Sequence, residues 1–278
     1  MITAAVTQGE VARHYDDLDR FYRRIWGEHV HHGFWGRGAR SPAKAAEHLV
    51  DLVAERLALR PGEDVCDIGC GYGATARRLA AQHDVRVTGV TLSAAQLAAA
   101  APGATPDNPR LLLLDWLANP FPDGAFDAAV AIESSEHMPD LARFYAEAAR
   151  TLRPGGRFVL CAWLAAEQPR AWARRLLLEP ICREGRLAQL ATAAEHRARL
   201  ERAGFRVRAV VDISRDVART WTICAARAAA LIATDRDARR FVLAPGEPNR
   251  VFVLTLARLR LAYAVGALRY AVITAEKP

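Results

Sequence analysis

The sequence predicts an α/β protein with a doubly wound, mostly parallel sheet. Between residues 60 and 162, short apolar runs alternate with stretches of helical periodicity, which is the pattern of βαβ units with right-handed crossovers. The run Val65–Ile68 leads into three glycines at alternate positions, Gly69, Gly71 and Gly73, and a helical stretch follows them. Hydrophobic residues make up 51% of the 278 residues, which is enough for a sizeable core.

Seven strands and the helices between them follow in order from apolar periodicity and turn residues. Ser41 and Ser93 are expected N-caps, and Pro42 is an expected first helical residue. The expected strands are Val65–Ile68, Val85–Val90, Leu111–Leu114, Phe126–Ile132, Arg157–Ala162, Phe205–Ile213 and Tyr270–Thr274. The expected helices are 10–25, 42–59, 74–82, a helix beginning at Ala94, 138–152 and Arg-rich helices within 168–203.

A long insertion, residues 214–269, separates the last two strands. It holds two apolar helical runs, about 216–233 and 250–266, on either side of Ala244–Pro248. An insertion of this length beside the strand ends usually shapes a substrate site, and its apolar content suits a hydrophobic substrate. The alternative is a helix pair that buries its own face or forms a homodimer.

Charge is distributed unevenly along the chain. Residues 1–150 contain 15 Lys and Arg against 20 Asp and Glu, whereas residues 151–278 contain 23 against 11. This asymmetry reflects either a genome that favours arginine codons or a basic cap suited to an anionic substrate. The arginines form no dense tract interleaved with aromatic residues, so nucleic acid is not an expected partner.

The cysteines and the termini indicate a cytoplasmic protein. The five cysteines are an odd number and read as reduced thiols. Cys66 and Cys70 lack a second Cys or His pair at zinc spacing, so no metal is expected. We expect no signal peptide, and no apolar stretch is long enough for a transmembrane segment.

A ligand is expected outside the carboxyl ends of the parallel strands. The residues at those ends are Asp67, Thr91, Asp115 and Glu133. The three glycines alone are a weak signal for a dinucleotide, and a dehydrogenase is the weaker alternative. A carboxylate at Asp115 can accept a hydrogen bond from the exocyclic amine of adenine, and Trp116 can pack on the ring or offer its backbone N–H.

Residues 60–162 together resemble the class I S-adenosylmethionine-dependent methyltransferases, whose core is a Rossmann-like seven-stranded sheet. The resemblance implies S-adenosyl-L-methionine as the cofactor. It also implies that Asp67, Gly69 and Gly71 hold the methionine part and that Asp115 and Trp116 hold adenine. The family usually has Asp or Glu after its second strand. The segment found here instead is similar to that of methyltransferases related to cyclopropane fatty acid synthases, which implies ribose contacts from Thr91 and Gln96, with Leu92 as a further cofactor-binding residue.

Segments outside this core look like the γ-tocopherol methyltransferase group. They are Trp26–Trp35, Glu133–Met138, Asp212–Trp221 and Leu268–Pro278. The resemblance implies methyl transfer to carbon, nitrogen or oxygen of a hydrophobic small molecule, of phenol, indole or terpenoid type, in specialised metabolism. The alternatives are a protein that only binds the cofactor and one that couples methylation to cyclisation of a prenyl diphosphate.

Roles for individual residues follow from what methyl transfer needs, namely a proton acceptor and a wall around the sulfonium. Each histidine named here also has a purely structural alternative. The catalytic candidates are His31, His32, Glu136 and His137; Tyr15 and Glu133 are expected around the cofactor; the substrate candidates are Tyr22, Trp26, Trp35 and Trp221. We expect one domain, 1–278, with a core of about 42–165 plus strands near 205–213 and 269–275, and a cap from 1–41, 166–200 and 214–268.

Overall fold

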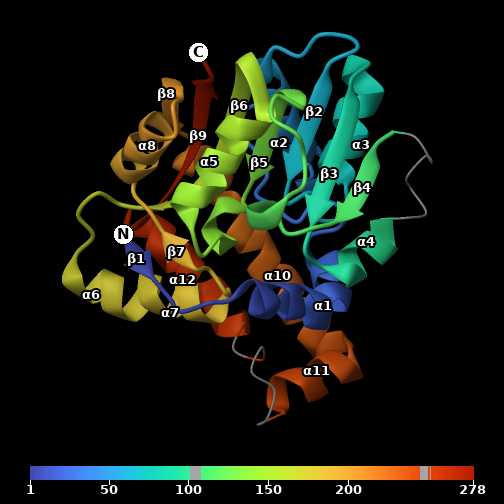
Figure 1. Cartoon of the computed structure of the whole chain (residues 1–278). Coiled ribbons are helices and arrows are strands. Elements are labelled where there is room, and N and C mark those ends of the chain that lie inside the picture. Colours follow the sequence, from blue (N-terminus) through green and yellow to red (C-terminus); the bar gives the residue numbers. More distant parts are fainter. Residues whose placement is uncertain (101–107, 245–249, 251) are drawn as a thin grey trace.

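The computed structural model of the chain describes residues 1–100, 108–244, 250 and 252–278. Its centre is a seven-stranded sheet in the order β4-β3-β2-β5-β6-β9-β8, shown in Figure 1. Strands β2 to β6 are parallel, and β9 runs antiparallel to β6 and β8. The strands are β2 Asp64–Ile68, β3 Arg86–Thr91, β4 Arg110–Leu113, β5 Phe126–Ile132, β6 Leu152–Ala165, β8 Arg206–Asp212 and β9 Leu268–Glu276. The predicted doubly wound, mostly parallel sheet is confirmed.

Helices cover both faces of this sheet. On one face α2 (Pro42–Leu57) and α3 (Ala74–His83) pack on the sheet through side chains such as Leu49, Val53 and Leu79. On the other face α5 (Leu141–Thr151) and α8 (Ala193–Arg202) do so through Phe144 and Leu200. The expected N-caps are present: the hydroxyl of Ser41 accepts from the Lys44 N–H, and the hydroxyl of Ser93 accepts from the Gln96 N–H.

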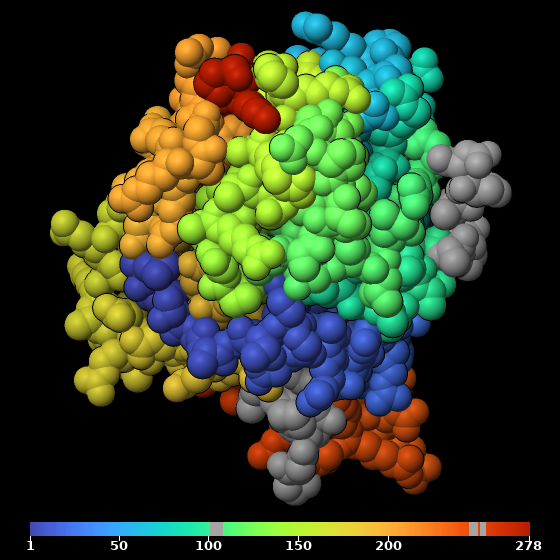
Figure 2. Space-filling view, viewed as in Figure 1, coloured from blue at the N-terminus to red at the C-terminus, as the bar shows by residue number. Residues whose placement is uncertain are grey.

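A third hydrophobic cluster forms the cap, which Figure 1 shows below the sheet. It joins α1 (Gln8–Ile25), α7 (Glu179–Glu184), α10 (Arg219–Thr234) and α12 (Phe252–Ala264). The short helix α4 (Ala94–Ala100) lies next to α1. In Figure 2, α11 (Arg236–Leu243) projects from the lower edge of the molecule. The cap therefore mixes the N-terminal helix with the late insertion.

Several boundaries differ from the sequence prediction. Strand β6 begins at Leu152 and ends at Ala165, beyond both ends of the expected strand Arg157–Ala162, and its residues 157–165 pair with β9. The helix expected at 138–152 begins later, as α5, which Asp140 caps, and a short 3-10 turn, η3 (Ser135–His137), precedes it. Asp is a frequent N-cap residue, so Asp140 could have predicted that the helix begins just after it.

The Arg-rich stretch after β6 is also more broken than expected. It contains α6 (Ala171–Ala173), the π-helical turn η4 (Arg174–Leu178), α7, and the strand β7 (Gln189–Leu190). Strand β7 pairs with the N-terminal strand β1 (Ile2–Thr3), a pairing too short to leave a periodic pattern. The insertion adds α9 (Ser214–Val217) and α11 to the two expected helices. Of the expected linker Ala244–Pro248, residues 245–248 lie outside the described residues.

No helix among the described residues is long and apolar enough to cross a membrane.

Candidate active site

Two adjoining pockets lie between the sheet and the cap. The strand-end pocket lies at the carboxyl ends of β2, β3, β4 and β5 and is covered by α1. Its volume is about 880 Å³, which includes some space open to solvent. The aromatic pocket, about 570 Å³, lies deeper among α1, α7, α10 and α12. The two pockets share four wall residues, which we call the junction: Tyr15, Val30, Glu133 and His137.

The glycine turn after β2 presents bare backbone to the strand-end pocket. Gly69 has a φ of +83°, and a Cβ built on it would lie 2.4 Å from Cβ of Ser134, so no larger residue fits. Gly71 also has a positive φ, +54°, and the nearest atom to its built Cβ is Nε2 of Gln96 at 3.8 Å. A ligand can therefore lie against the turn at Gly71.

Asp67 stands at the end of β2 with one oxygen unused. Its side chain lines the strand-end pocket, is 2% exposed, and its Oδ2 has no hydrogen-bond partner among the described residues. Burial raises the pKa of this carboxyl to about 7, although the Ala76 N–H acts in the opposite direction. An orphaned buried oxygen beside an open pocket indicates a place for a hydrogen-bond donor of a ligand.

The end of β3 supplies the polar wall that the sequence predicted. Thr91 donates to Oε1 of Gln96 at 3.0 Å, and both side chains are buried. Leu92 and Ser93 complete this wall of the strand-end pocket. Thr91, Leu92 and Gln96 are thus brought together as expected.

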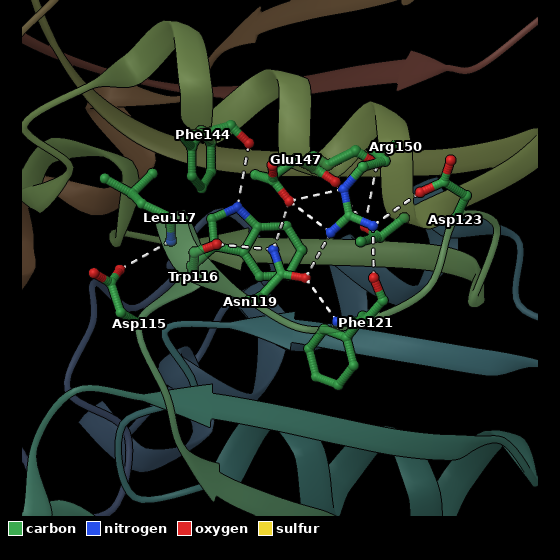
Figure 3. Close-up of polar contacts among 11 residues, drawn as sticks. Asp115, Trp116, Leu117, Asn119, Phe121, Asp123, Phe144, Glu147 and Arg150 are labelled. Atoms are coloured by element: carbon green, nitrogen blue, oxygen red, sulfur yellow. Dashed lines mark hydrogen bonds and ion pairs between the residues drawn. The ribbon is translucent and has the colours of Figure 1, made fainter.

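The end of β4 is arranged differently from the expectation. Trp116 lines the strand-end pocket, but its indole is 2% exposed and donates to the Phe144 carbonyl at 3.2 Å. Asp115 does not line the pocket, and its Oδ1 accepts from the Leu117 N–H at the start of η2 (Trp116–Ala118). Figure 3 shows this cap beside the Arg150–Glu147 ion pair that holds the following loop. The predicted adenine contact of Asp115 therefore has no support from this geometry.

Helix α1 is fastened over the strand-end pocket by two carboxylates. Asp16 accepts from the Ser93 hydroxyl at 2.5 Å and from the Ala95 N–H at 3.1 Å, at the start of α4. Asp19 accepts from the Tyr72 hydroxyl at 2.7 Å. Since Tyr72 belongs to the glycine turn, α1 is tied to both ends of the pocket floor.

Glu133 is the most heavily bonded acid at the junction. It has a φ of +55°, which is rare for a residue with a side chain and is found mainly at functional sites. Its Oε1 accepts from the backbone N–H and Nδ1 of His32 and from the Tyr270 hydroxyl, and its Oε2 accepts from the Trp163 indole. These four accepted hydrogen bonds favour the ionised carboxylate over the neutral acid. The carboxylate is therefore ionised.

His32, expected as a catalytic candidate, has both ring nitrogens engaged by protein groups. Nδ1 contacts Oε1 of Glu133 at 2.9 Å, and Nε2 contacts the Trp221 indole nitrogen at 2.6 Å. An indole N–H can only donate, so Nε2 is an acceptor and Nδ1 carries the proton. His32 lines neither pocket. This geometry speaks against His32 as the base, because its free lone pair is already used.

His137 has the opposite disposition. Its Nδ1 donates to the Arg186 carbonyl at 2.9 Å, which leaves Nε2 as an acceptor for the Tyr15 hydroxyl at 2.9 Å. Burial lowers the pKa of His137, so the imidazole is neutral. His137 lines both pockets, and its accepting nitrogen faces Tyr15, another junction residue. This is the arrangement that a general base needs.

The remaining catalytic candidates divide between the two pockets. His31 lines the strand-end pocket, donates from Nδ1 to the His32 carbonyl, and contacts His29 through Nε2. Glu136 lines the aromatic pocket and accepts from the Trp163 N–H and the Ser135 hydroxyl. Burial raises the pKa of Glu136 to about 8, so this carboxyl is mostly protonated at neutral pH.

The aromatic pocket combines rings with two acids. Three of the four substrate candidates, Tyr22, Trp26 and Trp221, line it, and none of the residues lining it is Lys or Arg. Trp35 lies outside it, because its indole donates to the Thr220 hydroxyl and its ring stacks under Arg219. Sequence reasoning missed Trp163, which lines this pocket at the end of β6. Trp163 directly follows the expected strand Arg157–Ala162, as Glu133 follows Phe126–Ile132, so the rule of reading strand ends could have found it.

The chain matches the sequence profile of the family described as mycolic acid cyclopropane synthetase over residues 4–245. It is 33% identical to 27-O-demethylrifamycin SV methyltransferase of Amycolatopsis mediterranei, over 98% of each chain. It is also 29% identical to the chloroplastic tocopherol O-methyltransferase of Arabidopsis thaliana, over 99% of this chain and 84% of that protein.

Solved structures extend the likeness over the whole chain. The [4+2]-cyclase SpnF superimposes with a TM-score of 0.81 at 27% identity, covering 100% of this chain and 99% of that one. The mycolic acid cyclopropane synthase CmaA1, complexed with SAH and CTAB, has the same fold, with a TM-score of 0.84 at 24% identity over 97% of this chain and 98% of that one. These likenesses confirm the predicted fold class.

Proposed function

The chain belongs to the mycolic acid cyclopropane synthetase family and is an S-adenosylmethionine-dependent small-molecule methyltransferase, and we propose that it methylates a hydroxyl group of a bulky, neutral, apolar natural product. The observation that carries the proposal is the neutral His137 imidazole at the junction, with an accepting Nε2. The identity of 33% to an enzyme named for 27-O-demethylrifamycin SV supports a natural product with a hydroxyl group.

The residues of the strand-end pocket fit S-adenosylmethionine. The orphaned Oδ2 of Asp67 matches the α-ammonium group, and the backbone of Gly71 leaves room for the methionine part. Thr91 and Gln96 offer polar groups for the ribose hydroxyls, and Trp116 offers its ring edge to adenine. We propose these contacts as the roles of those residues, with Asp115 shaping the loop rather than touching adenine.

Mechanistically, the protein has to hold donor and acceptor in line at the junction, exclude water and remove one proton. The cofactor supplies an electrophilic methyl group on a positively charged sulfur, which keeps the bonding electron pair and becomes a neutral thioether. The acceptor oxygen forms the new C–O bond, and its proton passes to Nε2 of His137 through the Tyr15 hydroxyl. The Nδ1–H bond to the Arg186 carbonyl holds the ring and stabilises the imidazolium that results.

The charge of the aromatic pocket favours a neutral acceptor. Its described walls carry Glu133 and Glu136, the neutral His137 and neither Lys nor Arg, so a diphosphate group would be buried there without a cationic partner. The alternative of a prenyl diphosphate acceptor therefore loses support. A cyclisation role keeps support from the likeness to the [4+2]-cyclase, since that protein shares the fold along its full length.

Methyl transfer from labelled S-adenosylmethionine tests the proposal. The panel should pair hydroxylated apolar macrolides, phenols and terpenoid alcohols with their methyl ethers and with geranyl diphosphate. We expect label only in alcohols or phenols, as a methyl ether located by NMR. Transfer to geranyl diphosphate, or no transfer to any alcohol by protein that binds S-adenosylhomocysteine, would contradict it.

The proposal also covers the number of domains, the cellular location and the oligomeric state. We propose one domain over residues 1–278, supported by the contact between Trp26 of the N-terminal segment and Trp221 of the insertion. We propose a cytoplasmic location because all five cysteines are buried free thiols. A homodimer through the cap is supported by the exposed Leu254 and Leu261 of α12 and the exposed Val265 just after it, and sedimentation of the purified protein tests it.

A further inference from the structure

The methyl group has to cross from the strand-end pocket to the aromatic pocket, so the positive sulfur of the donor belongs at the junction. Of the junction residues, Glu133 is the one with a carboxylate, and the four hydrogen bonds that its oxygens accept favour its ionised form. Its side chain is 9% exposed, and among the described residues its Oε2 accepts one hydrogen bond, from the Trp163 indole. A carboxylate oxygen can accept two, so Oε2 keeps room to face a positive ligand atom.

Whether Glu133 presents a net charge depends on His32. If His32 were an imidazolium, the pair would be neutral and would offer the donor little attraction. Because the Trp221 indole donates to Nε2 of His32 at 2.6 Å, a proton on Nε2 would point at another N–H. The Tyr263 hydroxyl also contacts Nε2, at 3.0 Å. The imidazole is thereby held neutral, and the pair retains one negative charge.

We propose that Trp221 and His32 are positioning residues that keep Glu133 as an uncompensated anion facing the donor's sulfonium, so that the site prefers the charged donor over its neutral product. Loss of the methyl group removes the positive charge, and the attraction to Glu133 goes with it. The device therefore favours release of S-adenosylhomocysteine after each turnover. The inference rests on the proposed place of methyl transfer but not on the identity of the acceptor.

The test compares two ligands by titration calorimetry without any acceptor. Sinefungin carries an ammonium group in place of the sulfonium, and S-adenosylhomocysteine is neutral at that position. In the unmodified protein we expect sinefungin to bind more tightly, and in Glu133→Gln we expect the ratio of the two dissociation constants to fall about tenfold, the effect of losing one close charge pair.

Two further variants separate positioning from folding. Trp221→Phe keeps an aromatic ring at this position but removes the N–H that bonds to Nε2 of His32. His32 can then take a second proton, with the Tyr263 hydroxyl as its acceptor. We expect the ratio of the two dissociation constants to fall as in Glu133→Gln. His32→Asn restores a neutral N–H donor at the position of Nδ1, and we expect the ratio to survive. ¹⁵N chemical shifts of His32 should report the Nδ1–H tautomer in the unmodified protein and mixed protonation in Trp221→Phe.

Trp35→Phe is the matched control, since that indole also donates to a neighbouring group, Thr220, but outside both pockets. We expect it to leave the ratio unchanged. An unchanged ratio in both Glu133→Gln and Trp221→Phe, or an equal fall in Trp35→Phe, would overturn the inference. These binding results do not depend on methyl transfer, so they stand apart from failure of the proposed function.

Discussion

The hydroxyl of Tyr15 lies 2.9 Å from Nε2 of His137, and this contact joins the N-terminal helix to η3, the turn that follows β5. The two residues are separated by more than a hundred positions in sequence, yet both belong to the junction. Asp16 and Asp19 hold the same helix over the strand-end pocket. Helix α1 therefore covers this pocket and also places Tyr15 beside His137.

The first prediction concerns Tyr15→Phe. Because the hydroxyl relays the acceptor proton to His137, its removal should lower kcat by about tenfold to a hundredfold. The dissociation constant of S-adenosylhomocysteine should change less than about threefold, since that hydroxyl bonds to His137. Loss of cofactor binding with kcat preserved would instead identify Tyr15 as a cofactor ligand, and calorimetry with steady-state rates decides between them.

Asp67→Asn should raise the stability of the cofactor-free protein at alkaline pH and weaken cofactor binding. Burial raises the pKa of Asp67 from 3.8 to about 7, so the folded state binds its proton more tightly than the unfolded state does. Stability of the cofactor-free protein should therefore fall between about pH 4 and 7, by roughly 1.4 kcal/mol per pH unit, and stay reduced above pH 7. The Asn variant lacks this cost and should melt at a higher temperature at pH 8.

The affinity for the cofactor should depend on pH in the opposite direction and should rise as Asp67 ionises. Only the ionised Asp67 can pair with the α-ammonium group, so affinity for S-adenosylhomocysteine should fall about tenfold per pH unit below pH 7. Asp67→Asn should bind weakly and without this slope. A wild-type affinity that is constant from pH 5.5 to 8 would contradict the assigned contact.

Glu136→Gln tests the second acid of the aromatic pocket. At pH 7 the wild-type carboxyl is mostly protonated, since burial raises its pKa to about 8, and an amide closely resembles it. Methyl transfer at pH 7 should therefore stay within about threefold of wild type, whereas any change in the wild-type rate near pH 8 should vanish in the variant. A loss of a hundredfold at pH 7 would make Glu136, and not His137, the preferred base.

Tyr72→Phe should loosen the helix over the cofactor. It removes the 2.7 Å hydrogen bond to Asp19 without touching the junction. We expect dissociation of S-adenosylhomocysteine to become about tenfold to a hundredfold faster in stopped-flow measurements, the cost of one hydrogen bond to a charged group. Arg37→Ala, which breaks a surface ion pair with Glu55, is the control and should leave the dissociation rate alone.

Strong local signals made most of the fold predictable from the sequence. The apolar runs before Asp67 and after Phe126 are buried central strands, and Ser41 and Ser93 cap helices as serines at such positions do. The strand β7 was missed because its pairing with β1 is a tertiary contact rather than a periodic pattern. The helix α11 does carry a local signal, because Asp235 caps it, and the prediction did not use that signal.

The sequence predicted which residues line the candidate site better than it predicted what each of them does. Residues at strand ends, such as Thr91 and Glu133, could be found because a parallel sheet gathers those ends at one edge. The distinction between His32 and His137 could not, since it depends on which nitrogen meets Trp221 and which meets Tyr15, partners far away in sequence. Asp115 likewise satisfies a local backbone N–H that periodicity does not reveal.

The central claim is that neutral His137 takes the acceptor proton at the junction of the two pockets. The most direct test is the single-turnover rate of methyl transfer against pH, with saturating cofactor, for wild type and His137→Gln. Wild type should lose activity only as the pH falls through a value below 6.5, since burial lowers the pKa of His137. The variant should be about a hundredfold to ten-thousandfold slower, with no such limb and with unchanged affinity for S-adenosylhomocysteine. A variant with the wild-type rate and the same acid limb would contradict the account.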